Sequence, residues 1–372
     1  MSALLRQIVD LLEAEYPSSW VVSGDRCGWE LGHPQSPIDT ILVALETTPA
    51  TVQEARERQA QLLLTHHPLL YRPPATLRED EPVAQLVSEL IRAGVALVSC
   101  HTNLDVAPGG INDYLAQRLG LSQVAVLSPT AWDACHKLAV FVPLGYEDRV
   151  RQALGEAGLG VIGRYAHCSF ACRGQGTYVP LAGARPFQGE VAGLSRAAES
   201  RLEMLAPESR LQEALARLRE VHPYEEVAYD LYPLHHPGLP LGLGRVGDWP
   251  EPRAFSQVLT LIKEIFRVET VRLWGRPPEQ VRRVALCSGS GGDLIHTARG
   301  QGAQLYLTGE VRHHQVPPGD FQDFAVAEVG HYASEAVFMP PWAKRLEGLL
   351  QQAGLEVQVK AAAAAAAPFA DI

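Results

Sequence analysis

Short apolar runs alternate with amphipathic segments along the first third of the chain. Apolar positions recur with a helical period in Pro49–Gln61 and Pro82–Ala93, as expected for helices with one buried face. Two continuous apolar runs, Leu62–Leu64 and Val95–Ser99, follow these helices directly and predict strands buried on both faces. The alternation predicts an α/β fold in which helices cover a parallel or mixed sheet.

The same alternation returns in the last third of the chain. A helix is predicted at Ala254–Phe266, and apolar strands are predicted at Gln304–Leu307 and Phe324–Val329. The run Leu-Leu-Leu-Thr65 compares with Leu-Tyr-Leu-Thr308, and a further strand that ends in a histidine motif follows each of them. These parallels predict two related α/β subdomains in one discontinuous core, although the duplication is weaker than a short-period repeat.

The middle of the chain has a different pattern and is predicted to be an insert. A strand at Lys137–Val142 and a helix at Glu147–Ala157 precede a glycine-rich stretch, which leads to a helix at Ser209–Val221 and a strand ending at Tyr232. This order fits a ferredoxin-like α+β unit. Proline and glycine crowd residues 233–252, as at a domain boundary. The predicted segments are residues 1–131, 132–235 and 236–372.

Composition narrows the class of protein. The 372 residues carry a net charge of −10, which argues against a general surface for nucleic acid or anionic membranes. No apolar run approaches the ~20 residues needed to cross a bilayer, and the N-terminus lacks the apolar core of a signal peptide. The six cysteines have no framework spacing, and Cys168 and Cys172 lack a second pair that would complete a zinc site. A cytoplasmic protein with reduced thiols is predicted.

Side chains that can bind metal ions stand at the ends of the predicted strands. His66, His67 and Pro68 follow the first apolar run, and His101 and Asp105 follow the second. Ligands collect where the strands of such sheets end, so both motifs point to one crevice. Pro68 restricts His67 to an extended conformation, and the two histidines could each serve one of two neighbouring ions. Asp105 offers a carboxylate that could bridge these ions.

A second group of candidate ligands lies in the last third of the chain. His331 and Glu335 have i,i+4 spacing and share one face if a helix runs through them. Imidazole with carboxylate suits Zn²⁺, Mn²⁺, Fe²⁺ or Co²⁺, and the lack of nearby cysteine argues against a closed structural zinc site. Two such ions could deprotonate a bridging water and promote hydrolysis near neutral pH. His101 and Glu310 are candidate proton-transfer or supporting groups because they also stand at strand ends.

Each motif alone has a simpler explanation, and only their joint occurrence favours a metal site. A His-His-Pro sequence is often a turn or a capped strand end, Thr-Asn-Leu-Asp is a common turn, and His-x-x-x-Glu on a helix is often an exposed surface pair. Two other pairs, His235-His236 and His313-His314, are expected either to be exposed to solvent or to contact metal ligands without binding the metal themselves. The strand-end motifs in both halves of the chain together indicate a metal-binding protein.

These residues resemble a known family, the GTP cyclohydrolase 1 type 2 homologues, also called Nif-three-like proteins. The resemblance covers nearly the whole chain and rests on five motifs: Thr65-His66-His67-Pro68, His101-Thr-Asn-Leu-Asp105, Gly289-Ser-Gly-Gly, Leu307-Thr-Gly-Glu310 and Gly330-His-Tyr-Ala-Ser-Glu335. The middle segment resembles the PII-like or CutA-like insert of the longer bacterial members, through His167-Cys-Ser-Phe170, Gly174-Gln-Gly-Thr177 and His222-Pro-Tyr-Glu-Glu.

The resemblance implies a dinuclear metal site, two related α/β subdomains and a ring-shaped homohexamer with the sites facing an internal cavity. The metal ligands that it implies are His66, His67, Asp105, His331 and Glu335. The chain departs from the family pattern after Lys360, where seven alanines precede Pro368 in place of an acidic turn. This departure concerns the tail of the chain and not the site.

Two functions are compatible with this sequence. The first is a metal-dependent hydrolase that attacks a nucleotide such as GTP through a metal-bound hydroxide, with zinc the expected metal and iron, manganese or cobalt the alternatives. The second is a non-catalytic regulatory protein that binds metal and whose PII-like insert senses a small ligand or docks a partner. Ligands specify the ions and not the substrate, so the sequence leaves this choice open. A DNA-associated regulator is disfavoured by the acidic balance.

Overall fold

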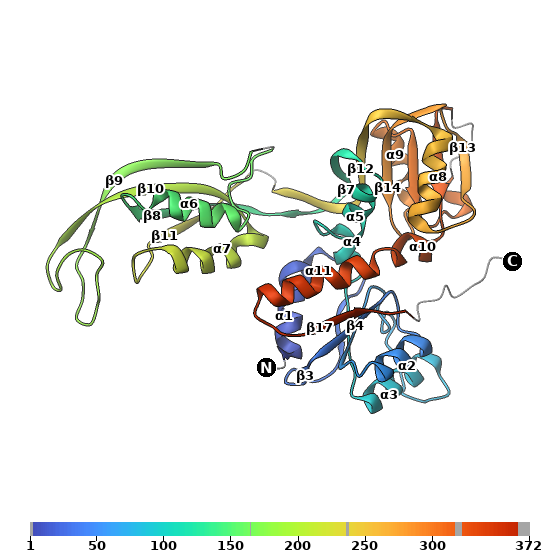
Figure 1. Ribbon diagram of the computed structural model, residues 1–372, viewed down its shortest axis with the longest axis horizontal. Helices are drawn as coiled ribbons and strands as arrows, with labels where there is room; N and C mark the ends of the chain where they lie inside the picture. The colour runs from blue at the N-terminus through green and yellow to red at the C-terminus, as the bar shows by residue number, and fades with distance from the viewer. Residues whose placement is uncertain (1–2, 164, 236–237, 317–321, 364–372) are drawn as a thin grey trace. The chain divides into compact units, whose positions relative to one another are not determined.

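The protein folds into two compact units (Figure 1). The computed structural model describes residues 3–163, 165–235, 238–316 and 322–363. The core unit comprises Met1–Ala131 and Leu241–Ile372, and the insert unit comprises Trp132–Pro240. The three domain segments expected from the sequence stay a prediction. Among the described helices, none combines the length and the apolar character that crossing a membrane requires.

The first sheet of the core unit brings two histidine motifs together. Its central strands, β4 (Thr40–Ala44), β5 (Leu62–Thr65) and β6 (Ala96–Ser99), are parallel and buried along their length. The strand order is β17-β4-β5-β6-β2, in which β17 (Gln358–Ala361) is parallel to β4 and β2 (Gly28–Leu31) is antiparallel to β6. The ends of β5 and β6 are in register, so the residues after both strands emerge at one edge of the sheet.

Helices cover both faces of this sheet. α2 (Pro49–Glu57) and α3 (Pro82–Ala93) pack on one face through a cluster that contains Leu42, Leu63 and Leu90. α1 (Leu5–Glu15) and α11 (Met339–Gln352) belong to a larger cluster that contains Ile41 and Leu64. Successive residues of a strand point to opposite faces, so a strand covered on both faces must be apolar throughout. This explains the uninterrupted apolar runs of the sequence.

The second sheet of the core unit repeats part of this plan. Its strands β14 (Gln280–Cys287), β15 (Leu305–Thr308) and β16 (Phe324–Glu328) are parallel. The order is β13-β16-β15-β14-β12-β7, with β13 (Arg272–Arg276), β12 (Leu239–Ala254) and β7 (Ser122–Asp133) as the outer strands. α8 (Phe255–Phe266) and α9 (Ile295–Gly300) pack against it.

The likeness between the two sheets supports the internal duplication seen in the sequence. β5 and β15 are both buried four-residue strands that end in a threonine. Each pairs in parallel with a strand, β6 or β16, that leads into a histidine motif. The core unit is therefore a mixed α/β fold with mixed sheets covered by helices, as the sequence predicted.

Short helices carry the candidate ligands that follow these strands. α4 (Thr102–Val106) begins immediately after His101, and α10 (His331–Ala336) contains both His331 and Glu335. The segment before Asp105 is thus helical and not the simple turn considered above. α5 (Ile111–Arg118) follows α4. The remaining elements are the pair β1 (Ala3–Leu4) and β3 (Pro37–Ile38) and the 3-10 helices Ser18–Trp20, Gly292–Leu294 and His313–Gln315.

The insert unit contains one antiparallel sheet and two helices. Its elements follow in the order β8 (Cys135–Pro143), α6 (Glu147–Glu156), β9 (Ser169–Tyr178), β10 (Ser195–Pro207), α7 (Glu208–Val221) and β11 (Tyr229–Pro233). The strand order is β11-β8-β10-β9, and the helices share one apolar cluster with Leu138, Val140 and Leu202. This is the β-α-β-β-α-β arrangement of ferredoxin-like folds. The glycine-rich stretch of the sequence contributes the strand β9.

The end of α2 differs from the sequence expectation. α2 was predicted to reach Gln61 but ends at Glu57, because Gln59 adopts a left-handed backbone conformation with φ 54° that an α-helix cannot contain. The alanine-rich tail is described only as far as Ala363, where its backbone N–H donates to the buried carboxylate of Glu54. The rest of the predicted departure from the family pattern lies outside the described residues.

Candidate metal centre

The sheet edge holds the two adjacent histidines in different environments. The backbone N–H groups of His66 and His67 donate to the carbonyls of Ala44 and Leu45, which extends the pairing of β5 with β4 past the end of the strand. The side chain of His66 is fully buried, and that of His67 remains 26% exposed. The pair therefore presents one imidazole from inside the core and one from the mouth of the site.

The other predicted ligands converge on this pair. Glu335 lies on the same face of α10 as His331, as the i,i+4 spacing predicted, and their Oε1 and Nε2 atoms are 3.2 Å apart. Glu335 Oε1 lies 3.7 Å from His66 Nε2, and Glu335 Oε2 lies 3.0 Å from His67 Nε2. Asp105 Oδ1 lies 3.9 Å from His66 Nε2. The structure thus brings together all five residues that the family resemblance implied as ligands.

These separations have the size expected of donor atoms around one cation. Zinc binds nitrogen and oxygen donors at about 2.0–2.2 Å, so two donors of a tetrahedral site lie roughly 3.3–3.6 Å apart. The measured range of 3.0–3.9 Å brackets this value. The donor set, imidazole nitrogen with carboxylate oxygen, suits Zn²⁺ and other first-row divalent ions.

Three of the imidazoles form a hydrogen bond through Nδ1, which fixes the orientation of the ring. His66 Nδ1 lies 2.8 Å from the carbonyl oxygen of Cys100, His101 Nδ1 lies 2.7 Å from Asp25 Oδ1, and His331 Nδ1 lies 3.1 Å from Glu310 Oε2. A carbonyl or carboxylate oxygen only accepts, so each Nδ1 carries the proton. The Nε2 lone pair of each ring is then free to face the site, which is how protein metal sites fix the tautomer of a histidine ligand.

His101 is closer to the centre than the sequence suggested. The structure contains two overlapping groups, His66-His67-His101 and His67-His331-Glu335, and within each group the donor atoms all lie within 4.8 Å of one another. From the sequence, His101 was predicted to be a proton-transfer or supporting group. The position of His101 in the structure also allows it to bind a metal ion. The role proposed for Glu310 as a supporting group agrees with its contact to His331.

The charge balance of the buried groups favours a cation. Burial alone would raise the pKa of Glu335, but the neighbouring imidazoles of His331, His66 and His67 hold it well below its usual value. Burial lowers the pKa of His66, yet the charges of Asp105 and Glu335 outweigh this effect and raise it to about 9. The pKa of His331 is also raised to about 9, chiefly by its contact with Glu335. Without a cation these two imidazoles therefore keep protons near neutral pH, and a metal ion must displace them.

Two polar atoms of the site lack a hydrogen bond. Among the described residues, His66 Nε2 and Glu335 Oε2 are both buried without a partner, even though His67 Nε2 is close to the latter. Buried polar atoms are nearly always paired in native proteins, and an ion is one of the accepted explanations for exceptions. The residues present thus fit a metal ion, on the geometry and on the donor chemistry.

A polar network joins the two halves of the core unit at Asp105. Ser288, which follows β14, donates through Oγ to Asp105 Oδ1 at 3.2 Å, and its backbone N–H donates to Asn112 Oδ1 at 2.9 Å. Asn112 donates in turn to the carbonyl of Asp105 at 3.0 Å and is completely buried. No pattern in the sequence marks Asn112 as part of the site, and Ser288 directly precedes the Gly289-Ser-Gly-Gly motif, to which no role was assigned. Neither residue was predicted.

Asp25 is a further residue that sequence reasoning missed. Burial would raise the pKa of its carboxyl, but hydrogen bonds from His101 and Thr102 lower it to about 2. A cavity of about 410 Å³ opens beside this residue, and Pro68 and Trp29 contribute to its wall. Pro68 follows His67, so the cavity adjoins the candidate metal centre. Its size lies within the range of small-molecule sites.

Comparisons with known proteins identify related chains. A model of the Duf34/NIF3 (NGG1p interacting factor 3) family matches residues 3–368. The GTP cyclohydrolase 1 type 2 homolog of Bacillus subtilis is 39% identical over 330 residues, which are 89% of this chain and 88% of the relative. The protein of the same name from Mycobacterium tuberculosis is 38% identical over 369 residues, with 96% and 95% coverage.

A solved structure extends the likeness to the fold. The crystal structure of a Bacillus cereus protein related to NIF3 matches with a TM-score of 0.81 and 34% sequence identity, over 100% of both chains. Three findings lead to one conclusion: a family model covers nearly the whole chain, relatives are more than 35% identical over most of their length, and the fold is shared. The chain belongs to the Duf34/NIF3 (NGG1p interacting factor 3) family.

Proposed function

We propose that the core unit binds two divalent metal ions and hydrolyses a nucleotide such as GTP. The observation that carries this proposal is that the Nε2 atoms of three imidazoles surround the buried carboxylate of Glu335. In two of these rings, His66 and His331, the Nδ1 atom is held by an oxygen, which a structural ion pair does not need. The set of donors, with His67 common to both groups, is larger than one tetrahedral ion requires.

The ligands of the two ions would be His66, His67, Asp105, His331 and Glu335. Divalent ions supply a water of lowered pKa that can attack near neutral pH. Zinc is the expected metal, and iron, manganese and cobalt suit the same donors. The printed name of the relatives, GTP cyclohydrolase 1 type 2 homolog, supports a nucleotide as the substrate.

The protein's own residues would bind and orient the substrate. The cavity next to Pro68 offers the indole of Trp29 as a surface on which a flat base can stack and the guanidinium of Arg26 as a partner for phosphate. His101 Nδ1 and the carboxylate of Asp25 form a hydrogen-bonded pair at this cavity. This pair is the candidate for moving a proton to the leaving nitrogen, as the position of His101 suggested.

The test begins with metal analysis of protein purified without added metal, followed by an anomalous-scattering map. Two adjacent peaks that touch the five named ligands are expected, and a single peak would refute the dinuclear assignment. The metal-loaded protein is then incubated with GTP and other nucleotides beside Asp105→Ala and His331→Ala variants. Turnover that both variants retain at the wild-type rate would refute the hydrolase.

A regulatory protein without catalysis is the second candidate. The observation that favours it is the independent core of the insert unit, which holds the predicted PII-like motif: Tyr224 donates to the buried Glu199 Oε1 at 2.9 Å, and the Phe187 ring packs on Tyr224. We infer that this PII-like insert would sense a small ligand or dock a partner. Ligand binding to the full-length protein, together with no turnover of any nucleotide, would favour this candidate over the hydrolase.

We also propose that the protein acts in the cytoplasm as a ring-shaped homohexamer. The support for this assembly is the family resemblance described above. Sedimentation of the purified protein is expected to give six times the 40.5 kDa mass of one chain. A stable monomer or dimer at micromolar concentration would contradict it.

A further inference from the structure

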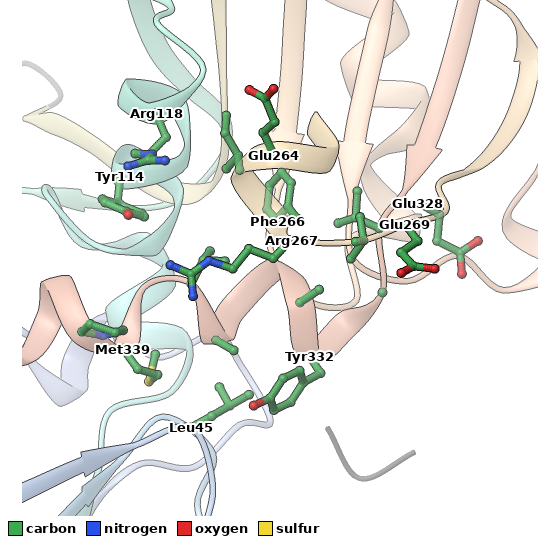
Figure 2. A pocket seen from close by; sticks show the side chains of 18 of the residues that line it. Leu45, Tyr114, Arg118, Glu264, Phe266, Arg267, Glu269, Glu328, Tyr332 and Met339 are labelled. Atoms are coloured by element: carbon green, nitrogen blue, oxygen red, sulfur yellow. The ribbon is translucent and has the colours of Figure 1, made fainter. Parts of the chain in front are cut away.

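The core unit contains a larger cavity that is separate from the candidate metal centre (Figure 2). It encloses about 940 Å³, and α10, the start of α11, the end of α8 and the helix α5 contribute to its wall. This volume lies within the range that proteins use for small ligands. The cavity draws its wall from both halves of the core unit, as binding sites between subdomains often do.

The helix α10 separates this cavity from the metal centre. His331 and Glu335 reach the metal centre from one face of the helix. Tyr332, Ala333 and Ala336 lie on the opposite face and line the cavity. The cavity wall includes neither His331 nor Glu335, and the two groups of candidate metal ligands include none of the other three residues, so the two sets of side chains belong to two different sites.

One end of the cavity is cationic. Arg118 ends α5, and Arg267 follows α8; among the described residues neither guanidinium has a hydrogen bond or an ion pair. In contrast, Arg272 at the cavity wall is paired with Glu328 at 3.1 Å. In Figure 2 the Arg267 side chain extends toward the side of Arg118 and Tyr114, while Glu269 and Glu328 lie on the other side. A third carboxylate, Glu264, also belongs to the wall and lies next to Phe266, between these two sides. Two unpaired guanidinium groups suit a carboxylate or a phosphate.

Arg267 is held in an unusual backbone conformation at this position. Its φ of 56° lies in the left-handed region, which non-glycine residues seldom occupy because Cβ crowds the backbone. A glycine would end α8 with less strain. Strained residues of this kind collect at ligand sites, where the side chain is needed. Figure 2 shows the side chain of Arg267 in the wall of the cavity.

The floor of the cavity is apolar. Leu45, Phe266 and Met339 are nearly fully buried and line it, and the ring of Tyr114 stands beside them. A methionine sulfur and an aromatic ring both make favourable contacts with a flat ring. We propose that the cavity binds a small organic anion that carries a flat ring, with its carboxylate or phosphate between Arg118 and Arg267 and its ring on this apolar floor.

A ligand in this cavity would contact the helix that carries two metal ligands. If it favours one position of α10, it changes the affinity of the metal centre, and the bound metal must change the affinity of the ligand by the same factor. This coupling rests on the proposed metal centre, whereas the binding of the anion does not. The two claims can therefore fail separately.

Calorimetry on the full-length, chelator-treated protein tests the binding. The probes are guanosine monophosphate and adenosine monophosphate for phosphate, benzoate for carboxylate, and inorganic phosphate without a ring. At least one ring-bearing probe is expected to bind about tenfold or more tightly than inorganic phosphate. Arg118→Ala and Arg267→Ala should each weaken it about tenfold or more, the usual effect of losing a charge-assisted hydrogen bond. Arg282→Ala, at an exposed residue outside the cavity, serves as the control.

Ala333→Leu fills the cavity without touching either arginine and should also weaken the probe. The absence of binding by every ring-bearing probe, or equal binding by the two arginine variants and the wild type, would overturn the proposal. Binding of the nucleotides alone identifies phosphate as the preferred group, and binding of benzoate alone identifies carboxylate. Repeating the titration with zinc-loaded protein tests the coupling: an unchanged affinity refutes the coupling and leaves the site in place.

Discussion

Ser288 offers a sharp test of how the two halves of the core unit cooperate at the metal centre. The change Ser288→Ala removes one hydroxyl and leaves the backbone N–H of residue 288 bonded to Asn112 Oδ1. The hydroxyl donates to Asp105 Oδ1 at 3.2 Å and so favours the ionised carboxylate, which is the form that binds a cation. We expect the variant to fold and to bind metal more weakly.

The magnitude follows from the geometry of this bond. A hydrogen bond to a charged group contributes about 1.5–3 kcal/mol, and 3.2 Å is long for an O–H···O contact, so the lower value of about 1.5 kcal/mol applies. Burial raises the pKa of Asp105, and the hydrogen bond from Ser288 lowers it, so losing the hydroxyl makes this carboxyl harder to ionise and weakens it as a metal ligand. An energy of about 1.4 kcal/mol corresponds to a tenfold change in affinity.

The assay is a competition for Zn²⁺ between the protein and a chromogenic chelator, with thermal unfolding of the metal-free protein measured in parallel. Ser200→Ala is the matched control, since Ser200 is as buried as Ser288 but lies in the insert unit. We expect about tenfold weaker zinc binding for Ser288→Ala alone. Unchanged affinity, or the same loss in both variants, would show that the contact across the two halves does not tune the site.

Three further predictions concern Glu335, Arg245 and His222. Glu335→Gln removes the carboxylate that faces three imidazoles, so the affinity for zinc should fall about 100-fold or more, as when one partner of a buried charge pair is lost. The zinc content of the variant after dialysis measures this loss, and a variant that retains all of its zinc would contradict the prediction. Arg245 is buried, pairs with Asp113 and donates to four backbone carbonyls. Arg245→Met should therefore lower the free energy of unfolding of the core, measured by urea denaturation, by about 3–5 kcal/mol. A loss below about 1 kcal/mol would refute the stabilising role of Arg245. Burial lowers the pKa of His222, and the Nδ1 atom of this residue accepts a hydrogen bond from the backbone N–H of Tyr224. Neutral His222 therefore stabilises the folded insert at pH values above about 6.5, the pKa of histidine in an unfolded chain. This stabilisation is lost as the pH falls below about 6.5. Unfolding of the full chain followed between pH 5 and pH 8 should show the loss in the wild type and a flatter profile in His222→Gln.

The sequence alone determined the local parts of this protein. Uninterrupted apolar runs identified β5 and β6, because a strand covered on both faces has no solvent side. The spacing of His331 and Glu335 predicted a shared helix face, because helix geometry is local. The motifs at the strand ends indicated one crevice, since parallel strands end at the same edge of a sheet. All of these inferences depend on short stretches of chain with a known period.

The tertiary structure decided which atoms meet. Asp25 lies 76 residues before its partner His101, and Ser288 lies 183 residues after Asp105; no period in the sequence relates such positions, because their contact depends on how the two sheets pack. The same holds for the cavity behind α10, whose wall joins residues from α5, α8 and α11. Local patterns thus identified the ligands, and only the packing of distant segments fixed their orientation, their charge balance and the space around them.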